Sequence, residues 1–586
     1  MLTDTARKLQ PARFSAPVCP AADRAISPVC PAVHPAVTRR SVGPMSTTAD
    51  RSVNDESPGA GPARATGPSR PARVDDLLRR RLTALVPASG SAPSVTSTAP
   101  FDGQPIAELP QCSPDDVVTA AERARAAQAR WARTGFGERA AVFLRFHDLV
   151  LEHRDTFMDL IQWENGKARR DAFLEVADVA NTARYYARTA ARTLAPSRRT
   201  GLIPGLTEVH ELHHPRGVVT IISPWNYPLS LGVGDTIPAL MAGNAVVQKA
   251  DNQTALTALF ALDLARRAGL PDDLWQIVLG RGSAIGTPLL DIADYVMFTG
   301  STASGRHIAR EAGERLIDCS LELGGKNAMV VLDDADLTRT VEGAVRACFS
   351  SSGQLCISIE RMYVADAVFD RFVPAFVEAV RSMTIGAAFD YSAQMGTLTS
   401  AEQLGVVSAH VDDAVAKGAT VLTGGRPRPE LGPYFYEPTV LTDVDSSMTC
   451  WREETFGPLV SIYRVGSDDE AVEAANDTAY GLNASVWSRS AARGRAVAAR
   501  LRAGTVNVNE AYAAAWGSID APMGGMGDSG LGRRHGAVGI LKYTETQTIA
   551  RQRLMNLAPP LQRLGDDGFA RVMTTALSLM KKAGWR

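Results

Sequence analysis

The chain has 586 residues, more than one hydrophobic core normally organises, so two or three domains are expected. Its formal net charge is −1 with 21% charged residues, and its short basic cluster, Arg79 to Arg81, is expected on a solvated helix face, which argues against a nucleic-acid partner. No apolar run approaches the ~20 residues that span a bilayer, no signal-peptide core is present, and the seven cysteines form no CxxC pair. We therefore expect a cytoplasmic protein without a membrane partner, disulfide framework or metal site.

Residues 1–75 are rich in proline, alanine, serine, glycine and arginine and have almost no periodic apolar residues. Such a segment cannot bury enough surface to offset the entropy lost on ordering, so we predict a disordered N-terminal tail. Within it, Met45 opens MSTTADRS. The proline-rich residues before Met45 do not suit the amphipathic helix of an organelle-targeting peptide, so we interpret them as an over-extended gene start.

A helical layer is predicted to follow the tail. VDDLLRRRLTALV, from Val74, is a short amphipathic helix, and residues 113–116 read Ser-Pro-Asp-Asp, with the serine as N-cap and the proline at the first helical position. Apolar residues then recur with helical spacing through Trp131, and again over 140–160 and 173–186.

From residue 209 the hydrophobic period changes from that of a helix to that of strands. EVHELHHPRG alternates as a β-ribbon does, and its three histidines have no Cys, Asp or Glu cluster at ligand spacing, so we interpret them as exposed ribbon residues. The β-branched run 217–223 then suits a buried parallel strand. Strands and helices alternate from there to residue 322, which predicts a doubly wound α/β sheet that binds its ligand at the carboxyl ends of the strands.

A second series of strands and helices runs from residue 328 to residue 510, with helices expected at 336–349 and 367–383. The glycine-rich segment 521–536 follows and can shape a substrate mouth. Residues 541–554 alternate again and are predicted to pair with the earlier ribbon. The last amphipathic segment, 569–584, is predicted to be a helix that covers the body of the protein.

Three short segments carry groups suited to covalent catalysis. Cys356 follows Ser-Ser-Ser-Gly-Gln-Leu, a small, polar and conformationally loose segment in which a thiol can face a cleft. Glu322 precedes two glycines in LELGGKN, and Asn226 lies in the proline-bounded SPWNYP. A thiolate nucleophile, a carboxylate base and an amide that stabilises an oxyanion would suit the oxidation of an aldehyde: the thiolate forms a thiohemiacetal, its hydride passes to a nicotinamide, and water cleaves the thioester that is left.

These three segments resemble the PWN, ELGGK and GQxC motifs of the aldehyde dehydrogenase superfamily, in that order, and the resemblance covers roughly residues 80 to 550. It implies an α/β fold with two doubly wound α/β domains and a β-ribbon oligomerisation arm, assembled as a homodimer or homotetramer. The expected division of the chain is a tail (1–75), a dinucleotide-binding domain (76–204 and 216–323), a catalytic domain (324–528), an arm (205–215 and 540–555) and a C-terminal helical extension (556–586).

A dinucleotide site is indicated by the GxGxxxG spacing of residues 280–286 and by the glycine and hydroxyl turn FTGST. In the family, the lysine that corresponds to Lys249 binds ribose, and many NAD-preferring members carry a glutamate where this chain has Asn252. A neutral amide does not repel a 2′-phosphate, so NADP is expected as the preferred cofactor, with NAD as the second choice. The expected cofactor-binding residues are Ser223, Pro224, Trp225, Asn226, Lys249, Asn252, Gly282, Gly286, Thr299, Gly300, Ser301, Leu323, Glu454 and Phe456.

The substrate is the point at which several interpretations stay open. CSLELGGKNAMVVLDDADL resembles the actinobacterial NADP-dependent succinate-semialdehyde dehydrogenases, yet the positions at which better-studied semialdehyde enzymes carry arginines are Gly234 and Ser350 here. Arg533 or Arg534 would then have to bind the substrate carboxylate. The alternatives are a dehydrogenase for uncharged medium-chain or aromatic aldehydes, a coenzyme A-acylating dehydrogenase, and a non-catalytic binding protein on the same scaffold.

Overall fold

The computed structural model describes residues 70–203, 206–553 and 565–585. Residues 1–69 of the predicted N-terminal tail, Met45 among them, lie outside the described residues, whereas its last residues are described and Val74 is buried in the core. The first helix is α1 (Asp76–Thr83), which Asp75 caps by accepting the Leu78 N–H. The predicted helix start at Ser113 is confirmed, because Ser113 and Asp116 form a reciprocal capping box at the first turn of α2 (Pro114–Trp131).

The first large sheet has six strands in the order β17-β9-β8-β5-β6-β7. All neighbours are parallel except β17, which runs antiparallel to β9. The strands in spatial order are β17 (Gly530–Leu531), β9 (Asp318–Glu322), β8 (Tyr295–Thr299), β5 (Val218–Ile222), β6 (Ala245–Lys249) and β7 (Trp275–Val278). The predicted doubly wound parallel sheet is therefore present.

Helices cover both faces of this sheet and bury a continuous apolar core against it. The helical layer predicted before the first parallel strand consists of α2, α3 (Phe136–Glu152), α4 (Arg154–Asn165) and α5 (Arg169–Thr193). The helices between the strands are α6 (Gly234–Met241), α7 (Ala255–Arg267), α8 (Gly282–Asp291) and α9 (Thr302–Glu314). A π-helix, η1 (Pro228–Val233), precedes α6, and a 3-10 turn, η2 (Asn252–Thr254), precedes α7.

The second large sheet has seven strands in the order β12-β13-β14-β11-β10-β15-β16, and only β12 is antiparallel. Its strands in spatial order are β12 (Thr420–Thr423), β13 (Thr439–Thr442), β14 (Leu459–Val465), β11 (Ile359–Ala365), β10 (Asn327–Val331), β15 (Asn483–Trp487) and β16 (Thr505–Val508). This sheet also has apolar clusters on both faces. The predicted class, an α/β protein with two doubly wound sheets, is confirmed.

Two pairs of helices cover the second sheet, and further short helices complete this part of the chain. On one face lie α10 (Leu337–Phe349) and α11 (Asp366–Arg381), and on the other α14 (Asp468–Asn476) and α15 (Ala491–Ala498). The remaining helices are the 3-10 turns η3 (Ser350–Gly353) and η4 (Gly527–Ser529), and α12 (Ala401–Ala416), α13 (Thr449–Arg452), α16 (Ala513–Trp516) and α17 (Gly536–Leu541).

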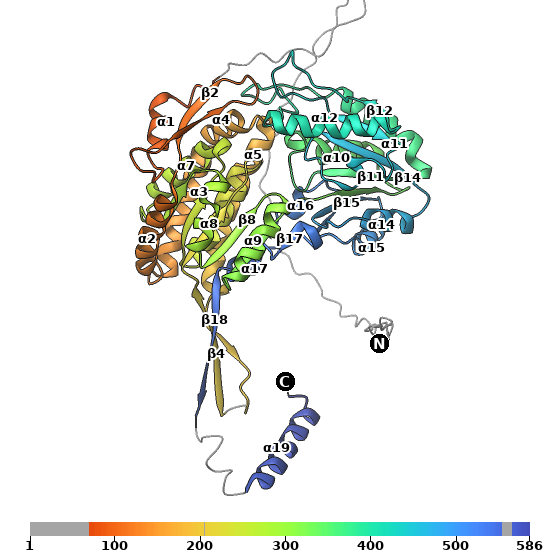
Figure 1. Cartoon of the computed structure of the whole chain (residues 1–586). Coiled ribbons are helices and arrows are strands. Elements are labelled where there is room, and N and C mark those ends of the chain that lie inside the picture. Colours follow the sequence, from red (N-terminus) through yellow and green to blue (C-terminus); the bar gives the residue numbers. More distant parts are fainter. Residues whose placement is uncertain (1–69, 204–205, 554–564, 586) are drawn as a thin grey trace, which may run out of the picture. The chain divides into compact units, whose positions relative to one another are not determined.

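A three-stranded ribbon projects from the two sheets (Figure 1). It joins β3 (Ser197–Arg199), β4 (Thr207–Pro215) and β18 (Thr544–Gln552), and β4 pairs with β18 along its whole length. The pairing predicted between the early and late alternating segments is thus confirmed. A separate hairpin of β1 (Ser94–Thr98) and β2 (Pro105–Pro110) lies near the start of the ordered chain.

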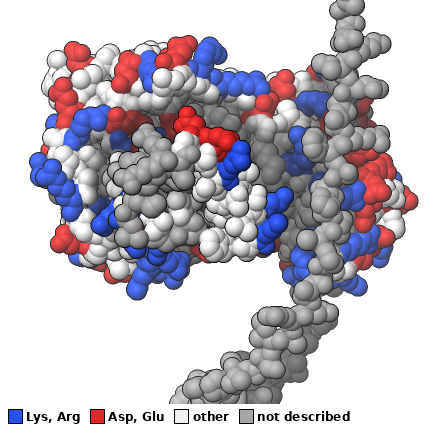
Figure 2. Space-filling view, turned by 90° about the horizontal axis from the view of Figure 1, so that it is seen from below, with Lys and Arg blue, Asp and Glu red and all other residues white. Residues whose placement is uncertain are grey.

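The surface carries mixed charge. On the face seen from below, positive and negative side chains are interspersed over the described residues (Figure 2). The predicted C-terminal helix is present as α19 (Gly565–Lys582), and none of its described side chains is buried, so the structure does not show it covering the body. Among the helices of the described ranges, none combines the length and apolar character that crossing a bilayer requires.

Candidate active site

The carboxyl ends of three neighbouring strands of the six-stranded sheet, β5, β8 and β9, meet at one edge. Asn226 lies four residues after β5, Thr299 ends β8, and Glu322 ends β9 opposite Thr299 in the register. Cys356 comes from the part of the chain that forms the second sheet, between η3 and β11. A cavity of about 250 Å³ opens here, and its lining residues are Pro224, Trp225, Asn226, Thr299, Gly300, Ser301, Glu322, Leu323, Gly324, Cys356, Gln403, Glu454 and Phe456.

A buried ion pair holds the turn that carries Asn226. Lys167 and Glu175 are both fully buried, with Lys167 Nζ 2.7 Å from Glu175 Oε1. Lys167 Nζ also donates to the Asn226 carbonyl at 2.5 Å, and Glu175 accepts the N–H of Leu229 at 2.9 Å. The backbone of the turn is therefore fixed from both ends, and the Asn226 amide donates to the Gln354 carbonyl at 3.1 Å, two residues before the cysteine.

The segment before Cys356 is tight, so the prediction of a conformationally loose segment is wrong. Ser351 and Ser352 adopt left-handed backbone conformations with φ of 52° and 56°. Asp171 on α5 accepts the Ser351 N–H at 2.8 Å, and the Asn327 amide donates to the Cys356 carbonyl at 2.8 Å. These bonds hold non-glycine residues in a conformation they rarely adopt, which fixes the position of the thiol.

The two glycines after Glu322 are required by close approaches. A Cβ at Gly324 would lie 2.3 Å from Glu454 Oε2, and a Cβ at Gly325 would lie 2.7 Å from the Cys356 carbonyl oxygen. The prediction that these glycines permit a close approach is confirmed for Gly325, whose neighbour is the backbone of the cysteine.

Burial sets the acid–base properties of the two central groups. It raises the pKa of Glu322 to about 7, against the lowering effect of the Arg534 charge. Glu322 Oε1 is buried without a hydrogen-bond partner among the described residues. Burial, followed by the charges of Glu322 and Glu454, raises the pKa of the Cys356 thiol to about 12. The Cys356 thiol is therefore held neutral beside a carboxylate that titrates near neutral pH. The thiol can donate a proton and the carboxylate can accept it, so the pair is suited to proton transfer.

The segment of Glu454 and Phe456 is positioned by a second buried ion pair. Glu360 pairs with Lys326 and accepts the backbone N–H groups of Thr455 and Phe456 at 3.0 and 2.9 Å. Phe456 has a left-handed φ of 52° and packs edge-to-face on Trp225 at 5.6 Å between ring centroids. Glu454 accepts the Gly325 N–H at 2.8 Å.

The remaining predicted cofactor residues lie outside the cavity lining. Ser223 follows β5, Lys249 ends β6, and its Nζ donates to the Ala250 carbonyl at 3.4 Å. The Asn252 amide donates to Gln111 Oε1 at 2.9 Å, and its own oxygen has no partner among the described residues. Gly282 and Gly286 lie in the first two turns of α8, where added Cβ atoms would meet open space.

This edge has the donors and shape that suit a nicotinamide dinucleotide. The hydroxyl of Thr299, which has no hydrogen-bond partner among the described residues, and the carboxylate of Glu454 line the cavity together with the rings of Trp225 and Phe456. Ser301 caps α9 at the same edge, and a helix start offers free N–H groups to a phosphate. The residues present therefore fit the cofactor that the sequence indicated. Among the described residues no group of three His, Cys, Asp or Glu side chains is arranged to hold a metal ion.

Arg534 lies in the interior, which corrects its predicted role as a cation for the substrate carboxylate. Only 3% of the residue is exposed, and Nη2 lies 3.3 Å from Asp235 Oδ2. Arg534 lines none of the described cavities. Arg533 donates to the carbonyls of Gly525 and Gly532 beside the glycine-rich loop. The positive charge of Arg534 acts instead on Glu322, whose pKa it lowers against the effect of burial.

A second cavity, of about 470 Å³, is lined by Ser350, which lies six residues before Cys356. Tyr512 donates to Ser350 Oγ at 2.9 Å. Leu174 lines this cavity and packs against the same apolar cluster that Cys356 contacts. Along the chain, the segment 350–356 runs from Ser350, which lines the second cavity, to Cys356, which lines the first. The lining residues are Arg170, Asp171, Leu174, Val341, Glu342, Val345, Arg346, Phe349, Ser350, Ala379, Ser382, Met383, Gln394, Tyr512 and Ala513.

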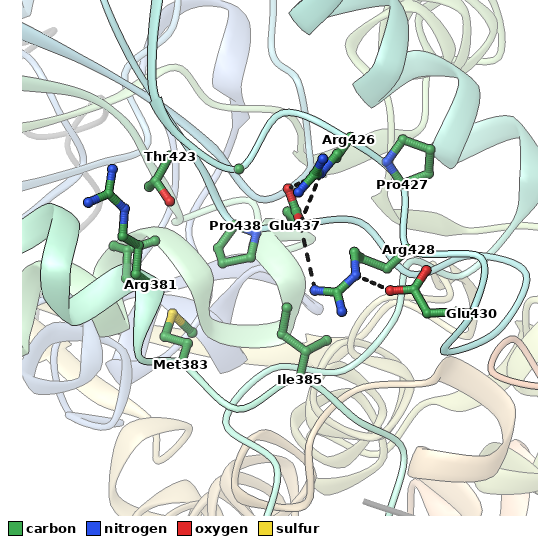
Figure 3. A pocket seen from close by; sticks show the side chains of 12 residues that line it. Arg381, Met383, Ile385, Thr423, Arg426, Pro427, Arg428, Glu430, Glu437 and Pro438 are labelled. Atoms are coloured by element: carbon green, nitrogen blue, oxygen red, sulfur yellow. Dashed lines mark hydrogen bonds and ion pairs between the residues drawn. The ribbon is translucent and has the colours of Figure 1, made fainter. Parts of the chain in front are cut away.

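A third and larger cavity, of about 680 Å³, lies away from the cysteine on the β12 side of the second sheet (Figure 3). Arg426 and Arg428 line it and both pair with Glu437, while Arg428 also pairs with Glu430. Arg381 lines the same cavity and donates to the Leu422 carbonyl. Its charges are largely satisfied within the chain, and none of the predicted catalytic residues contributes to it.

The sequence interpretation missed the residues that hold this site together. Lys167, Asp171, Glu175, Lys326 and Glu360 are all charged and almost fully buried. Lys326 lies within LELGGKN, and Glu360 lies four residues after Cys356. Their position in or beside the motifs was therefore a usable signal. Asp171 and Glu175 lie on α5, far from the motifs in sequence, and gave no comparable signal.

The fold and the cysteine-centred cavity define a class of enzyme that acts on carbonyl compounds, and comparison with known proteins gives the family. The profile of the Aldehyde dehydrogenase family matches residues 87–549, and the chain belongs to this family.

Similar proteins carry related names. A Mycolicibacterium smegmatis protein provisionally named succinate-semialdehyde dehydrogenase [NADP(+)] is 56% identical over 461 residues, 79% of this chain and 89% of the relative. The mitochondrial succinate-semialdehyde dehydrogenase of Arabidopsis thaliana is 37% identical over 454 residues, 77% and 84% of the two chains.

Solved structures agree with this assignment. An NADP-dependent enzyme of E. coli superposes with a TM-score of 0.76 at 32% identity, over 79% of this chain and 96% of that one. A betaine aldehyde dehydrogenase from Staphylococcus aureus in complex with NAD+ gives a TM-score of 0.76 at 29% identity, over 82% and 99%.

Proposed function

We propose that the chain oxidises succinate semialdehyde to the dicarboxylic acid, with Cys356 as nucleophile and NADP as preferred cofactor. The observation that carries the proposal is the convergence of Cys356, Glu322 and Asn226 on one cavity that also contains Trp225 and Phe456. The substrate and the cofactor rest on the names of the mycobacterial and plant relatives and on Asn252, which leaves the ribose end of the site without a carboxylate at that position.

The chain's own residues perform the proton transfers and the charge stabilisation. Glu322, with its pKa near 7, accepts the thiol proton as Cys356 Sγ adds to the aldehyde carbon. The Asn226 amide and the Cys356 N–H stabilise the oxyanion that forms. A bound nicotinamide dinucleotide supplies the hydride acceptor. Glu322 releases the first proton to solvent and then accepts one from the water that attacks the thioester, so that the Cys356 thiolate is expelled and the acid leaves.

The division of the chain follows the same proposal. Residues 76–204 and 216–323 bind the dinucleotide, and residues 324–528 supply the nucleophile. The β4/β18 ribbon, within 205–215 and 540–555, joins a second copy of the chain in a homodimer or homotetramer. Most described residues of β18 are exposed in the single chain, as expected of a surface that a partner covers.

Acid formation from succinate semialdehyde, measured with NADP or NAD and with or without coenzyme A, tests the proposal. The account expects acid without coenzyme A and a higher kcat/KM with NADP. Thioester product that requires coenzyme A would favour an acylating dehydrogenase. No product under any condition, from a folded protein that still binds NADP, would favour a binding protein.

A further inference from the structure

The second cavity differs in character from the site around Cys356. Four apolar side chains on α5 and α10 line it, Leu174, Val341, Val345 and Phe349, and Met383 lies after α11. Ser350, at its inner end, takes the position where semialdehyde enzymes carry an arginine, and its hydroxyl is held by Tyr512. The inner wall therefore offers apolar surface and hydroxyl groups.

The cavity is larger than a four-carbon substrate requires. Succinate semialdehyde has about seven non-hydrogen atoms, and at roughly 30 Å³ each, the share of one water in the liquid, it occupies about 200 Å³. The cavity measures about 470 Å³, within the usual range of small-molecule sites. An unbranched aldehyde of about six to eight carbons would fill it better.

The cations of this cavity lie at its exposed rim. Arg346 is exposed and pairs with Glu510. Arg170, in the first turn of α5, is exposed, and its side chain has no hydrogen bond or ion pair with any other described residue. Arg170 is thus the cation of this lining that can take an anionic partner without breaking an existing pair.

Two carboxylates share the lining and have to be considered beside Arg170. Asp171 is buried and accepts the Ser351 N–H, so its carboxylate is already hydrogen-bonded to the segment before Cys356. Glu342 is exposed on α10, one turn before Arg346. Glu342 opposes an incoming anion, whereas Arg170 attracts it.

We propose that this cavity leads to Cys356 and admits ω-oxo carboxylic acids longer than succinate semialdehyde, with the aldehyde at Cys356, the carbon chain against Leu174 and Phe349, and the distal carboxylate on Arg170. The proposal rests on the proposed function, since it assigns the substrate class of the same site. It places specificity for the carboxylate at the rim of the cavity, away from the nucleophile.

The test compares kcat/KM for ω-oxo acids of four, six and eight carbons with that for unbranched, uncharged aldehydes of the same lengths. We expect the preference for the charged aldehyde to be larger at six and eight carbons than at four. Arg170→Gln should reduce kcat/KM for the long charged aldehydes by about threefold to tenfold, as suits an exposed charge pair, and leave the uncharged ones unchanged. The effect should weaken at high salt.

Two control variants separate this role from a general loss of charge. Glu342→Gln removes the opposing charge from the same lining and should increase the preference for long charged aldehydes. Arg381→Gln removes an exposed arginine that lines the neighbouring third cavity (Figure 3), which shares Met383 with the second, and should change nothing because Arg381 does not line the second cavity. A charge preference greatest at four carbons, or an equal effect of Arg170→Gln on charged and uncharged aldehydes, would overturn the proposal.

The experiment also distinguishes failure of this inference from failure of the proposed function. If succinate semialdehyde is oxidised and Arg170→Gln has no selective effect, the inference is wrong and the proposed function stands. If no aldehyde is oxidised, the proposed function fails, and titration of suberate into the Cys356→Ala chain, with and without Arg170→Gln, tests the subsite directly. Suberate binding that Arg170→Gln weakens supports the subsite, and no difference between the two proteins overturns it.

Discussion

Arg534 and Asp235 form an ion pair in the interior, with side chains only 4% and 2% exposed. Arg534 also donates to the Ser230 carbonyl at 3.2 Å, and its Nη2 lies 3.5 Å from where a Cβ at Gly234 would be. A large side chain at position 234 would therefore compete with the Arg534 guanidinium for space. The glycine at position 234 thus leaves the space that the Arg534 guanidinium occupies.

Removal of the Arg534 charge should shift the pH dependence of the reaction. Arg534 lowers the pKa of Glu322 and Asp235 raises it, with burial as the larger effect that brings it to about 7. Because Glu322 acts as a base, kcat/KM should fall as the pH drops through its pKa. In Arg534→Gln the pKa rises further, so the acid limb of the pH profile should move to higher pH, with more activity lost at pH 7 than at pH 9.

The double variant Arg534→Gln/Asp235→Asn provides the control. A lone Asp235 carboxylate in the interior costs several kcal/mol, so the single variant should lose stability, and removal of both charges should restore part of it. The double variant removes two opposing influences on Glu322, so its acid limb should return toward that of the unmodified protein. An acid limb that stays in place in the folded single variant would show that Arg534 does not act on Glu322.

Replacement of the nucleophile should separate chemistry from binding. Cys356→Ser should abolish turnover and leave the thermal stability and NADP binding unchanged, because the side chains are similar in size. Cys348→Ala is the matched control: Cys348 is fully buried eight residues earlier, and its loss should lower stability without abolishing turnover. Near-normal turnover in Cys356→Ser would rule out the mechanism.

Glu322→Gln should slow turnover by roughly 10²–10⁴-fold, the usual contribution of a positioned base. The amide keeps the shape of the side chain and cannot accept the proton. Single-turnover experiments that follow reduced cofactor and free acid separately show which step is affected. Normal rates for both would mean that another group is the base.

The ribose end of the cofactor site should respond to charge at position 252. Asn252→Asp keeps the side-chain shape and adds a negative charge beside a 2′-phosphate. Hydrogen bonds to charged groups contribute about 1.5–3 kcal/mol, so the NADP preference should fall by one to two decades in kcat/KM, with NAD little affected. A strict NAD preference in the unmodified protein would contradict the role given to Asn252.

Local sequence patterns predicted the elements whose causes are local. The serine and proline before α2 predicted its capping box, and the alternating segments that became β4 and β18 predicted a ribbon. The motifs predicted that Cys356, Glu322 and Asn226 share a site, and all three line one cavity. Glu322 ends a strand of the six-stranded sheet and Asn226 follows one, whereas Cys356 precedes β11 of the second sheet.

Features that depend on contacts distant in sequence were not predictable in the same way. The segment before Cys356 is polar and small in sequence, but Asp171, 180 residues away, holds it in a left-handed conformation. Arg534 follows a glycine-rich loop, which suggested exposure, yet Asp235 on α6 draws it into the interior. The second cavity combines α5, α10 and the segment after β16, and no local pattern indicated that these would meet.

The covalent intermediate on Cys356 is the most direct test of the central claim. The Glu322→Gln chain should accumulate it once the slowed attack of Cys356 has taken place, because hydrolysis of the thioester also needs the base. Intact-mass and peptide mass spectrometry after mixing with succinate semialdehyde and NADP should show one succinyl group on Cys356, absent when NADP is omitted and absent from Glu322→Gln/Cys356→Ala. An unmodified Cys356 in a protein that still forms reduced cofactor, or a succinyl group on another residue, would contradict the account.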